Sequence, residues 1–176
     1  MKINISPIIK NHINTLYDAK NNKISIVDVL TFYVLPGVLF YPIYKNNILL
    51  DKDFYNVSIT FFGIFIALLL NIEVAIFGIF TRKWSIEGKE IIKKDKFDER
   101  NKIIKEVDSN ISYLTILCIF SLFYFIFVYC CVGGNVFNNI CYISMVSAYL
   151  YLHFGLTLLM VVKRSHALFQ REYNEK

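Results

Sequence analysis

Apolar residues are gathered into four long blocks along this chain, and polar residues separate the blocks. The blocks cover Ile24–Tyr44, Phe54–Phe80, Ile111–Val132 and Ile140–Val162. Each block matches the roughly 20 helical residues that cross a bilayer. Ser109–Val162 contains no Asp, Glu, Lys or Arg, and Gly133-Gly134-Asn135 near its middle supplies a turn between two crossings. We therefore predict an all-α integral membrane protein with four transmembrane helices.

The charge distribution predicts how these helices are oriented. Hydrophobic residues make up 56% of the chain and the mean hydropathy is +0.47, which is too apolar for an ordinary soluble domain. Of the 19 Lys and Arg residues, 17 lie in segments 1–23, 81–110 and 163–176. The positive-inside rule places these segments in the cytoplasm. We expect a multi-pass protein of the bacterial cytoplasmic (inner) membrane. Domain 24–162 holds the four spans and the cytoplasmic hairpin 81–110, and both termini, including the tail 163–176, lie in the cytoplasm.

The N-terminal segment 1–23 is predicted to contain a short amphipathic helix. Ser6 suits the N-cap and Pro7 suits the first helical position. Apolar residues then recur on one side at Ile8, Ile9, Ile13, Leu16 and Tyr17. Two interpretations stay open: the helix lies on the inner leaflet, or it packs on the cytoplasmic loop of its own or a neighbouring chain.

The loop 81–110 is rich in charges of both signs, with nine basic and seven acidic residues. We expect it to extend the second and third spans as a cytoplasmic helical hairpin that reverses near Lys94–Phe97. One interpretation is a solvated helical stalk. The other is a surface that binds a cytoplasmic regulator, such as a nucleotide or nucleic acid. The basic residues available for such binding are Lys89, Lys93, Lys94, Lys96, Arg100, Lys102 and Lys105.

Polar residues inside the spans are the candidates for a pore or ion pathway, because charge in hydrocarbon is costly. Glu73 lies about 13 Å from Arg82 at the predicted inner edge. The opposite face of its helix carries small residues, including Asn71, which allow close helix packing. If that face packs inside the subunit, Glu73 faces a pore, a cavity or a second subunit. His153 is at a similar predicted depth, so a Glu73–His153 pair is one possible arrangement.

Two further features of the spans concern the backbone. Ser25 and Asp28 fit a capping pattern at the start of the first span, which favours a structural role for this acid. Pro36 and Gly37 lie in the middle of the same span. Proline removes a backbone hydrogen bond and permits a kink, so these two residues are a candidate gate hinge.

The cysteines near the predicted outer surface allow two interpretations. Cys130 and Cys131 precede the Gly133-Gly134 turn, and Cys141 follows it. A disulfide from Cys141 to either of the others is geometrically possible, but free cysteine is also a common small apolar residue in spans. The spacing of Cys and His is not that of a zinc site, so we expect no metal and no cofactor.

The motifs in the sequence limit the classes of function that this chain can have. The chain has three His residues and lacks the sequence motifs of hydrolases and metalloproteases, so we do not expect an enzyme. Its length, four spans and charged inner hairpin resemble the small membrane effectors of bacterial anti-phage defence, including the Hailong type. That resemblance implies a multimeric channel, held closed by a cytoplasmic nucleic-acid ligand and opened during infection.

We therefore expect a regulated homo-oligomeric channel or membrane-permeabilising effector in the lipid bilayer. Four spans in one chain enclose too little space for a wide channel, so several copies are needed. One alternative is a small proton- or cation-coupled transporter that uses Glu73. The other alternative is a membrane anchor subunit that transports nothing.

Overall fold

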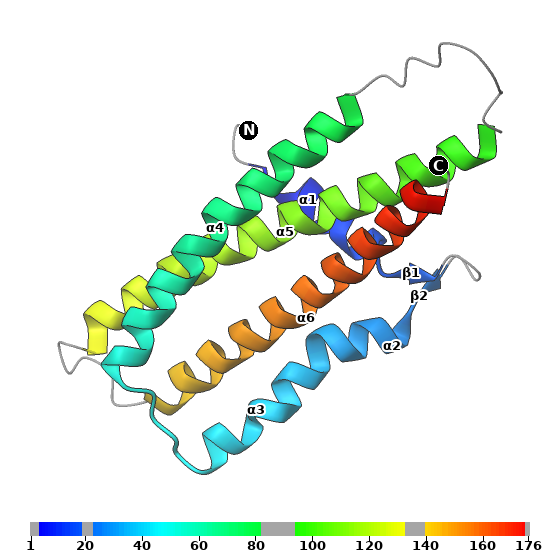
Figure 1. The fold of residues 1–176 in the computed structure, drawn as a ribbon. Coiled ribbons are helices and arrows are strands. Elements are labelled where there is room, and N and C mark those ends of the chain that lie inside the picture. The colour runs from blue at the N-terminus through cyan, green and yellow to red at the C-terminus, as the bar shows by residue number, and fades with distance from the viewer. Residues whose placement is uncertain (1–3, 19–22, 82–93, 133–139, 175–176) are drawn as a thin grey trace.

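The computed structural model describes residues 4–18, 23–81, 94–132 and 140–174, and the fold is helical apart from one very short strand pair (Figure 1). Strands β1 (Tyr17–Asp18) and β2 (Lys23–Ile24) pair antiparallel. The helical elements are α1 (Ser6–Asn14), α2 (Ile26–Val29), the π-helical turn η1 (Leu30–Val34), α3 (Leu35–Lys45), α4 (Lys52–Thr81), α5 (Lys94–Val132) and α6 (Ile140–Asn174).

Four helical segments are long and apolar enough to cross a membrane, which confirms the predicted all-α membrane fold. They are Ile26–Lys45, Lys52–Gly78, Asn101–Cys131 and Cys141–Ala167. The first consists of α2, η1 and α3 in direct succession, and we call it membrane helix 1. The reversal was predicted near Lys94–Phe97, and these residues form the first turn of α5. Residues 82–93, which include Lys89 and Lys93, lie outside the described part of the chain.

Aromatic side chains fill the space between α4, α5 and α6. Phe62 of α4 and Phe125 of α5 are fully buried and stack with their ring centroids 5.4 Å apart. Phe154 of α6 meets the edge of Phe62 at 5.5 Å, and Tyr151 lies 5.2 Å from the same ring. Each aromatic pair adds about 0.5–1.5 kcal/mol beyond simple burial. These three helices therefore form a tightly packed unit.

Membrane helix 1 packs on α6 and contributes little to this core. Pro36 is the buried residue among its described side chains, while Val27 and Val38 are mostly exposed. Figure 1 shows its axis changing direction where the π-helical turn joins α2 to α3. Proline at position 36 explains the change, because it lacks the N–H that would continue the regular hydrogen-bond ladder.

Helix α1 packs against α5 of its own chain, which agrees with the second interpretation of the N-terminal segment. His12 and Leu16 face the bundle and are buried, whereas Ile9 and Ile13 remain 38% and 37% exposed. The predicted Ser6 cap is wrong, because no side chain caps the helix at its N-cap position. Instead the Ser6 N–H donates to Asn4 Oδ1 at 3.1 Å. We call this end of the bundle, where α1 docks, the α1 end.

Candidate functional site

A histidine in α6 completes the broken hydrogen bonding of membrane helix 1. In a regular α-helix the carbonyl of Phe32 would accept from the N–H of residue 36, which is a proline. Instead His153 Nδ1 lies 2.9 Å from the Phe32 carbonyl oxygen. A carbonyl only accepts, so His153 carries its proton on Nδ1. Neighbouring helices commonly satisfy backbone groups that a proline leaves free inside a membrane.

The second nitrogen of this imidazole faces α5. Tyr113 Oη lies 2.8 Å from His153 Nε2, and because Nε2 is unprotonated the tyrosine hydroxyl donates. The side chain of His153 is only 3% exposed. Both ring nitrogens are therefore used, and three helical elements, η1, α5 and α6, meet at this one side chain.

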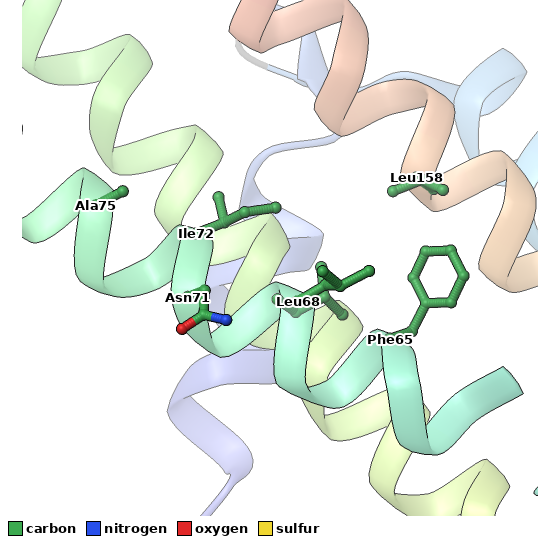
Figure 2. Close-up of a pocket in the computed structure, with 7 residues that line it drawn as sticks. Phe65, Leu68, Asn71, Ile72, Ala75 and Leu158 are labelled. Atoms are coloured by element: carbon green, nitrogen blue, oxygen red, sulfur yellow. The ribbon is translucent and has the colours of Figure 1, made fainter. Parts of the chain in front are cut away.

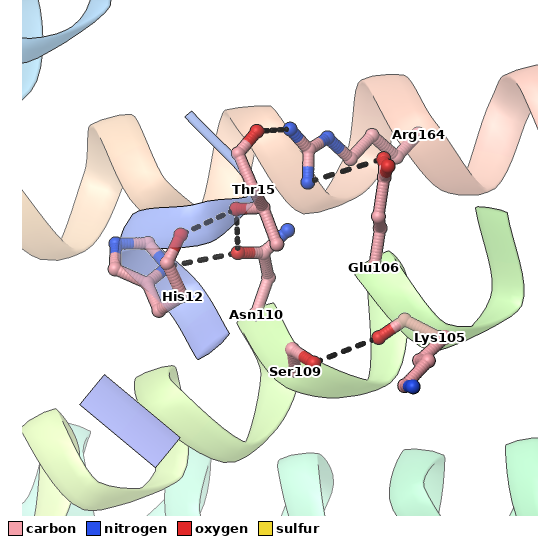
Figure 3. A network of polar contacts seen from close by, with 7 residues as sticks. All are labelled: His12, Thr15, Lys105, Glu106, Ser109, Asn110 and Arg164. Atoms are coloured by element: carbon pink, nitrogen blue, oxygen red, sulfur yellow. Dashed lines mark hydrogen bonds and ion pairs between the residues drawn. The ribbon is translucent and has the colours of Figure 1, made fainter. Parts of the chain in front are cut away.

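Tyr113 connects this site to the N-terminal helix. Its ring stacks on the ring of His12 with centroids 3.8 Å apart and planes only 1° from parallel. His12 Nδ1 lies 2.8 Å from Asn110 Oδ1, one turn earlier on α5. Thr15 Oγ1 lies 2.9 Å from the same amide oxygen and 2.7 Å from the His12 carbonyl, as Figure 3 shows.

The docked helix is also held from α6. Arg164 Nη2 donates to the Thr15 carbonyl at 2.5 Å, and Arg164 Nη1 lies 3.6 Å from Glu106 Oε2. Figure 3 shows the Arg164 guanidinium between the Thr15 carbonyl and the Glu106 carboxylate. We call the connected set the polar network; its members are Phe32, His153, Tyr113, His12, Asn110, Thr15, Arg164 and Glu106.

The electrostatics of His12 follow from its burial. The side chain is fully buried, and desolvation of the imidazolium lowers the pKa of His12 to about 4. The Asn110 hydrogen bond raises this pKa, whereas the charges of His153 and Arg164 lower it. His12 is therefore neutral at neutral pH, and protonating it would put a charge in an apolar site.

Glu73 lies away from the polar network, and both ring nitrogens of His153 are bonded to other groups, so the possible Glu73–His153 pair is not formed in this structure. The side chains of α4 that contact Phe154, next to His153, are Phe61, Phe62 and Phe65. Glu73 comes about 12 Å further along α4. It is half-buried on the side of α4 that carries Leu69, and no described residue makes an ion pair with it.

The small-residue face of α4 points out of the subunit. From the sequence we considered the opposite arrangement, in which this face packs inside the subunit and Glu73 faces outward. Ala67, Asn71, Ala75 and Gly78 are all exposed. Asn71 is two residues, or about 200° around the helix, from buried Leu69. Gly63 lies against α5, where an added Cβ would meet Leu122 Cδ1 at 3.6 Å. The spacing of the small residues along the sequence identified this face of α4, but it did not show which side of α4 the other helices cover.

An open apolar groove lies beside this face. It has a volume of about 370 Å³ and is lined by residues of α4, from Phe65 to Ala75, and by Leu158 of α6. Figure 2 shows Phe65 and Leu158 across the groove from Ile72, with the Asn71 amide pointing away from Leu158. The groove therefore separates this part of α4 from Leu158 of α6.

The predicted cap and the predicted hinge both lie in or directly before membrane helix 1. Ser25 Oγ accepts from the Asp28 N–H at 3.3 Å, which is the expected cap, but the Ser25 N–H donates to the Leu16 carbonyl instead of to Asp28. Pro36 is buried at the kink, and an added Cβ on Gly37 would meet nothing within 4 Å.

The predicted basic residues in the described part of the chain lie on α5. They are Lys94, Lys96, Arg100, Lys102 and Lys105. Lys102 and Lys105 are exposed. Their exposure fits either interpretation, a solvated stalk or a binding surface, so binding through these residues stays a prediction.

The cysteines are free thiols. Cys130 and Cys131 are at least partly exposed at the end of α5, and Cys141 is buried in α6. The Cys141 thiol lies 3.2 Å from the Tyr44 carbonyl oxygen, where it donates a weak hydrogen bond to the end of membrane helix 1. The structure therefore agrees with the interpretation of ordinary thiols in a membrane helix.

Sequence reasoning missed most of the polar network. One signal was available: a proline in a span leaves the carbonyl four residues before it, here Phe32, in need of a donor. His12 and Asn110 gave no such signal, because a polar residue on an amphipathic helix usually faces water. Comparison of the chain with protein-family models, curated proteins and solved structures finds no match, so the contacts described above carry the functional conclusion.

Proposed function

We propose that copies of this chain assemble in a bacterial cytoplasmic membrane into a regulated channel or membrane-permeabilising effector. The observation that carries this proposal is the outward face of α4. Asn56, Thr60 and Asn71 are exposed on it, on the opposite side from buried Tyr55, Phe62 and Leu69. In a bilayer this face would put polar groups against hydrocarbon, which is unfavourable.

A second copy of the chain removes that cost. An amide both donates and accepts, so two Asn71 side chains can pair across a symmetric contact. Small residues at Ala67 and Ala75, one turn before and after Asn71, let two α4 helices approach closely. Water in an opening between copies would satisfy the same groups. Both arrangements place α4 at the centre of an oligomer.

The interior of one subunit supports a path between copies and not through a single chain. Phe62, Phe125 and Phe154 interlock between α4, α5 and α6, and such packing leaves no room for hydrated ions at that level of the described bundle. An opening lined by α4 from several copies avoids this barrier. The positive-inside rule predicts that the basic α1 end faces the cytoplasm, where the resemblance to anti-phage effectors implies a controlling nucleotide or nucleic-acid ligand.

Glu73 has a different place in this proposal from the one expected from sequence. It lies on the inner side of α4 toward the α1 end and has no ion-pair partner among the described residues. A carboxylate there would meet cations at the cytoplasmic mouth once the helices separate. If Glu73 instead binds a proton or cation during transport, its substitution should abolish substrate-dependent growth without any effect on membrane potential.

The test is membrane potential in cells on induced expression, with cross-linking of copies as a second readout. We expect wild type to depolarise the membrane and Asn71→Leu to reduce this effect at matched membrane levels. Val74→Ala, on the exposed side of the same helix, is the matched control. In a chain without native cysteines, Asn71→Cys should cross-link between copies and Leu159→Cys, exposed on α6, should not. Absence of both depolarisation and cross-linking would refute the proposal.

A further inference from the structure

We propose that α1 is a regulatory latch: its docking on α5 and α6 holds the kinked half of membrane helix 1 in place, and its release lets that half move. This inference deepens the proposed function by naming the element that controls the channel. The coupling between α1 and membrane helix 1 is nevertheless a statement about the fold, and it can be measured without any ion flux.

The first connection runs through side chains. His12 covers the face of the Tyr113 ring, and the Tyr113 hydroxyl donates to His153. His153 in turn donates to the Phe32 carbonyl that Pro36 leaves free. When His12 leaves, one face of the Tyr113 ring is uncovered and its rotamer is no longer fixed from that side. The proper tautomer and position of His153 depend on that hydroxyl.

The second connection runs through the backbone. The Ser25 N–H donates to the Leu16 carbonyl at 3.0 Å, which ties the start of α2 to the end of α1. Strands β1 and β2 pair in the same segment, with Tyr17 opposite Ile24. Movement of α1 therefore pulls on α2, while α3 beyond the kink is held separately by α6. The two halves of membrane helix 1 have different attachments.

The docked position is incompletely satisfied, which suits a latch. His12 Nε2 and Asn110 Nδ2 are buried and have no hydrogen-bond partner among the described residues. Buried polar groups without partners oppose the packed state. α1 is also only nine residues long, and elements with few buried contacts open most readily. Docking of α1 is therefore weaker than the packing of α4, α5 and α6.

The experiment measures the kink by double electron–electron resonance in the full-length chain without native cysteines, reconstituted in bilayers. One spin-label pair is Val27 on α2 with Leu159 on α6; the other is Val38 on α3 with Leu159, and all three positions are exposed. The latch is released by His12→Ala and, as a milder change, by Thr15→Val. Asn14→Ala on the exposed side of α1 is the matched control.

Release of the latch should shift and broaden the Val27–Leu159 distances and leave the Val38–Leu159 distances unchanged. The control variant should match wild type in both. Thiol labelling of Leu16→Cys, which is 2% exposed when α1 is docked, confirms separately that the latch has opened. Faster labelling with unchanged Val27–Leu159 distances would overturn the inference, as would equal shifts in both label pairs.

Ion flux through the same bilayers separates this inference from the proposed function. If the Val27–Leu159 distances shift and flux rises several-fold, both stand. If the distances shift and no variant conducts, the latch stands and the channel proposal fails. If variants conduct while the distances match those of wild type, the channel stands and the latch fails.

Discussion

Replacing Pro36 by alanine should make His153 largely dispensable to membrane helix 1. The two residues are linked through one atom: Pro36 cannot donate to the Phe32 carbonyl, and His153 Nδ1 donates to it at 2.9 Å. An alanine at position 36 would restore the missing N–H and allow a regular helical hydrogen bond. The structure therefore predicts a strong interaction between two substitutions on different helices.

The expected loss of unfolding free energy follows from the hydrogen bonds that His153 makes. His153→Leu removes the bond to Phe32 and the bond from Tyr113, and hydrogen bonds between membrane helices contribute about 0.6–2 kcal/mol each. We expect His153→Leu to lower the unfolding free energy by about 2 kcal/mol in the wild-type background. In the Pro36→Ala background the Phe32 carbonyl no longer needs the imidazole, so the loss should fall to about 1 kcal/mol.

The assay is equilibrium unfolding of the four proteins of this double-mutant cycle in the same detergent. The interaction free energy isolates the contact at Phe32, because the Tyr113 bond is lost equally in both backgrounds. A control cycle pairs Pro36→Ala with Thr157→Val, a buried α6 residue that bonds within its own helix. Additive effects of Pro36→Ala and His153→Leu would refute the assignment of His153 as the donor to the kink.

Three other predictions test separate parts of the fold. The pKa of His12 is about 4 when α1 is docked and about 6.5 when the side chain is exposed. As pH falls, the released state therefore binds a proton before the docked state does. Docking of α1 should be complete above pH 6.5, and its free energy should weaken by up to about 3 kcal/mol as pH falls toward 4. Because only the thiolate reacts, each labelling rate is divided by that of a fully exposed thiol at the same pH. This normalised rate for Leu16→Cys should therefore rise over that range in the chain with native His12 and stay flat when His12→Gln is added, and a flat profile with native His12 would contradict the burial argument. Gly37→Ala should raise the unfolding free energy in detergent by up to about 1 kcal/mol, because alanine favours the helix more than glycine and an added Cβ meets no atom within 4 Å. A lower unfolding free energy would show that the kink needs glycine. In native protein, Cys130 should react quickly with a polar thiol reagent and Cys141 slowly, given their exposure, whereas a cysteine pair that reacts only after reduction would contradict the free thiols.

The charged groups near His12 bear on the pH prediction. Glu106 on α5 pairs with Arg164 on α6 at 3.6 Å, so this carboxylate is already compensated, and the Arg164 guanidinium repels an imidazolium at His12. His153, also on α6, is bonded to Phe32 and Tyr113 and supplies no negative charge. No described acid pairs with His12, so protonation should release α1 instead of tightening it.

The four membrane helices could be predicted from sequence because the bilayer sets their length and composition. The predicted third span began at Ile111, and α5 begins at Lys94, because the charged residues before the span continue the same helix, as the predicted extension of that span required. The packing of the helices was harder to predict. The spacing of Ala67, Asn71 and Ala75 identified one face of α4, but which face the rest of the chain covers depends on α5 and α6. Glu73 and His153 were matched by counting residues from the predicted edge, and the tilts and offsets of real helices invalidate such counting.

The division of contacts indicates which part of the subunit can move. Interlocked aromatic rings join α4, α5 and α6, and separating them would expose several large side chains at about 1.5–3 kcal/mol each. Membrane helix 1 buries only Pro36 among its described side chains and is held to α6 by a few polar contacts, including His153 with Phe32 and Cys141 with Tyr44. Contacts of this kind contribute about 1 kcal/mol each. A ligand that prefers one position of helix 1 by a few kcal/mol can therefore shift its population, whereas the same free energy would leave the aromatic core intact. Regulation of this fold is thus expected to act through α1 and membrane helix 1, with α4, α5 and α6 as the fixed frame.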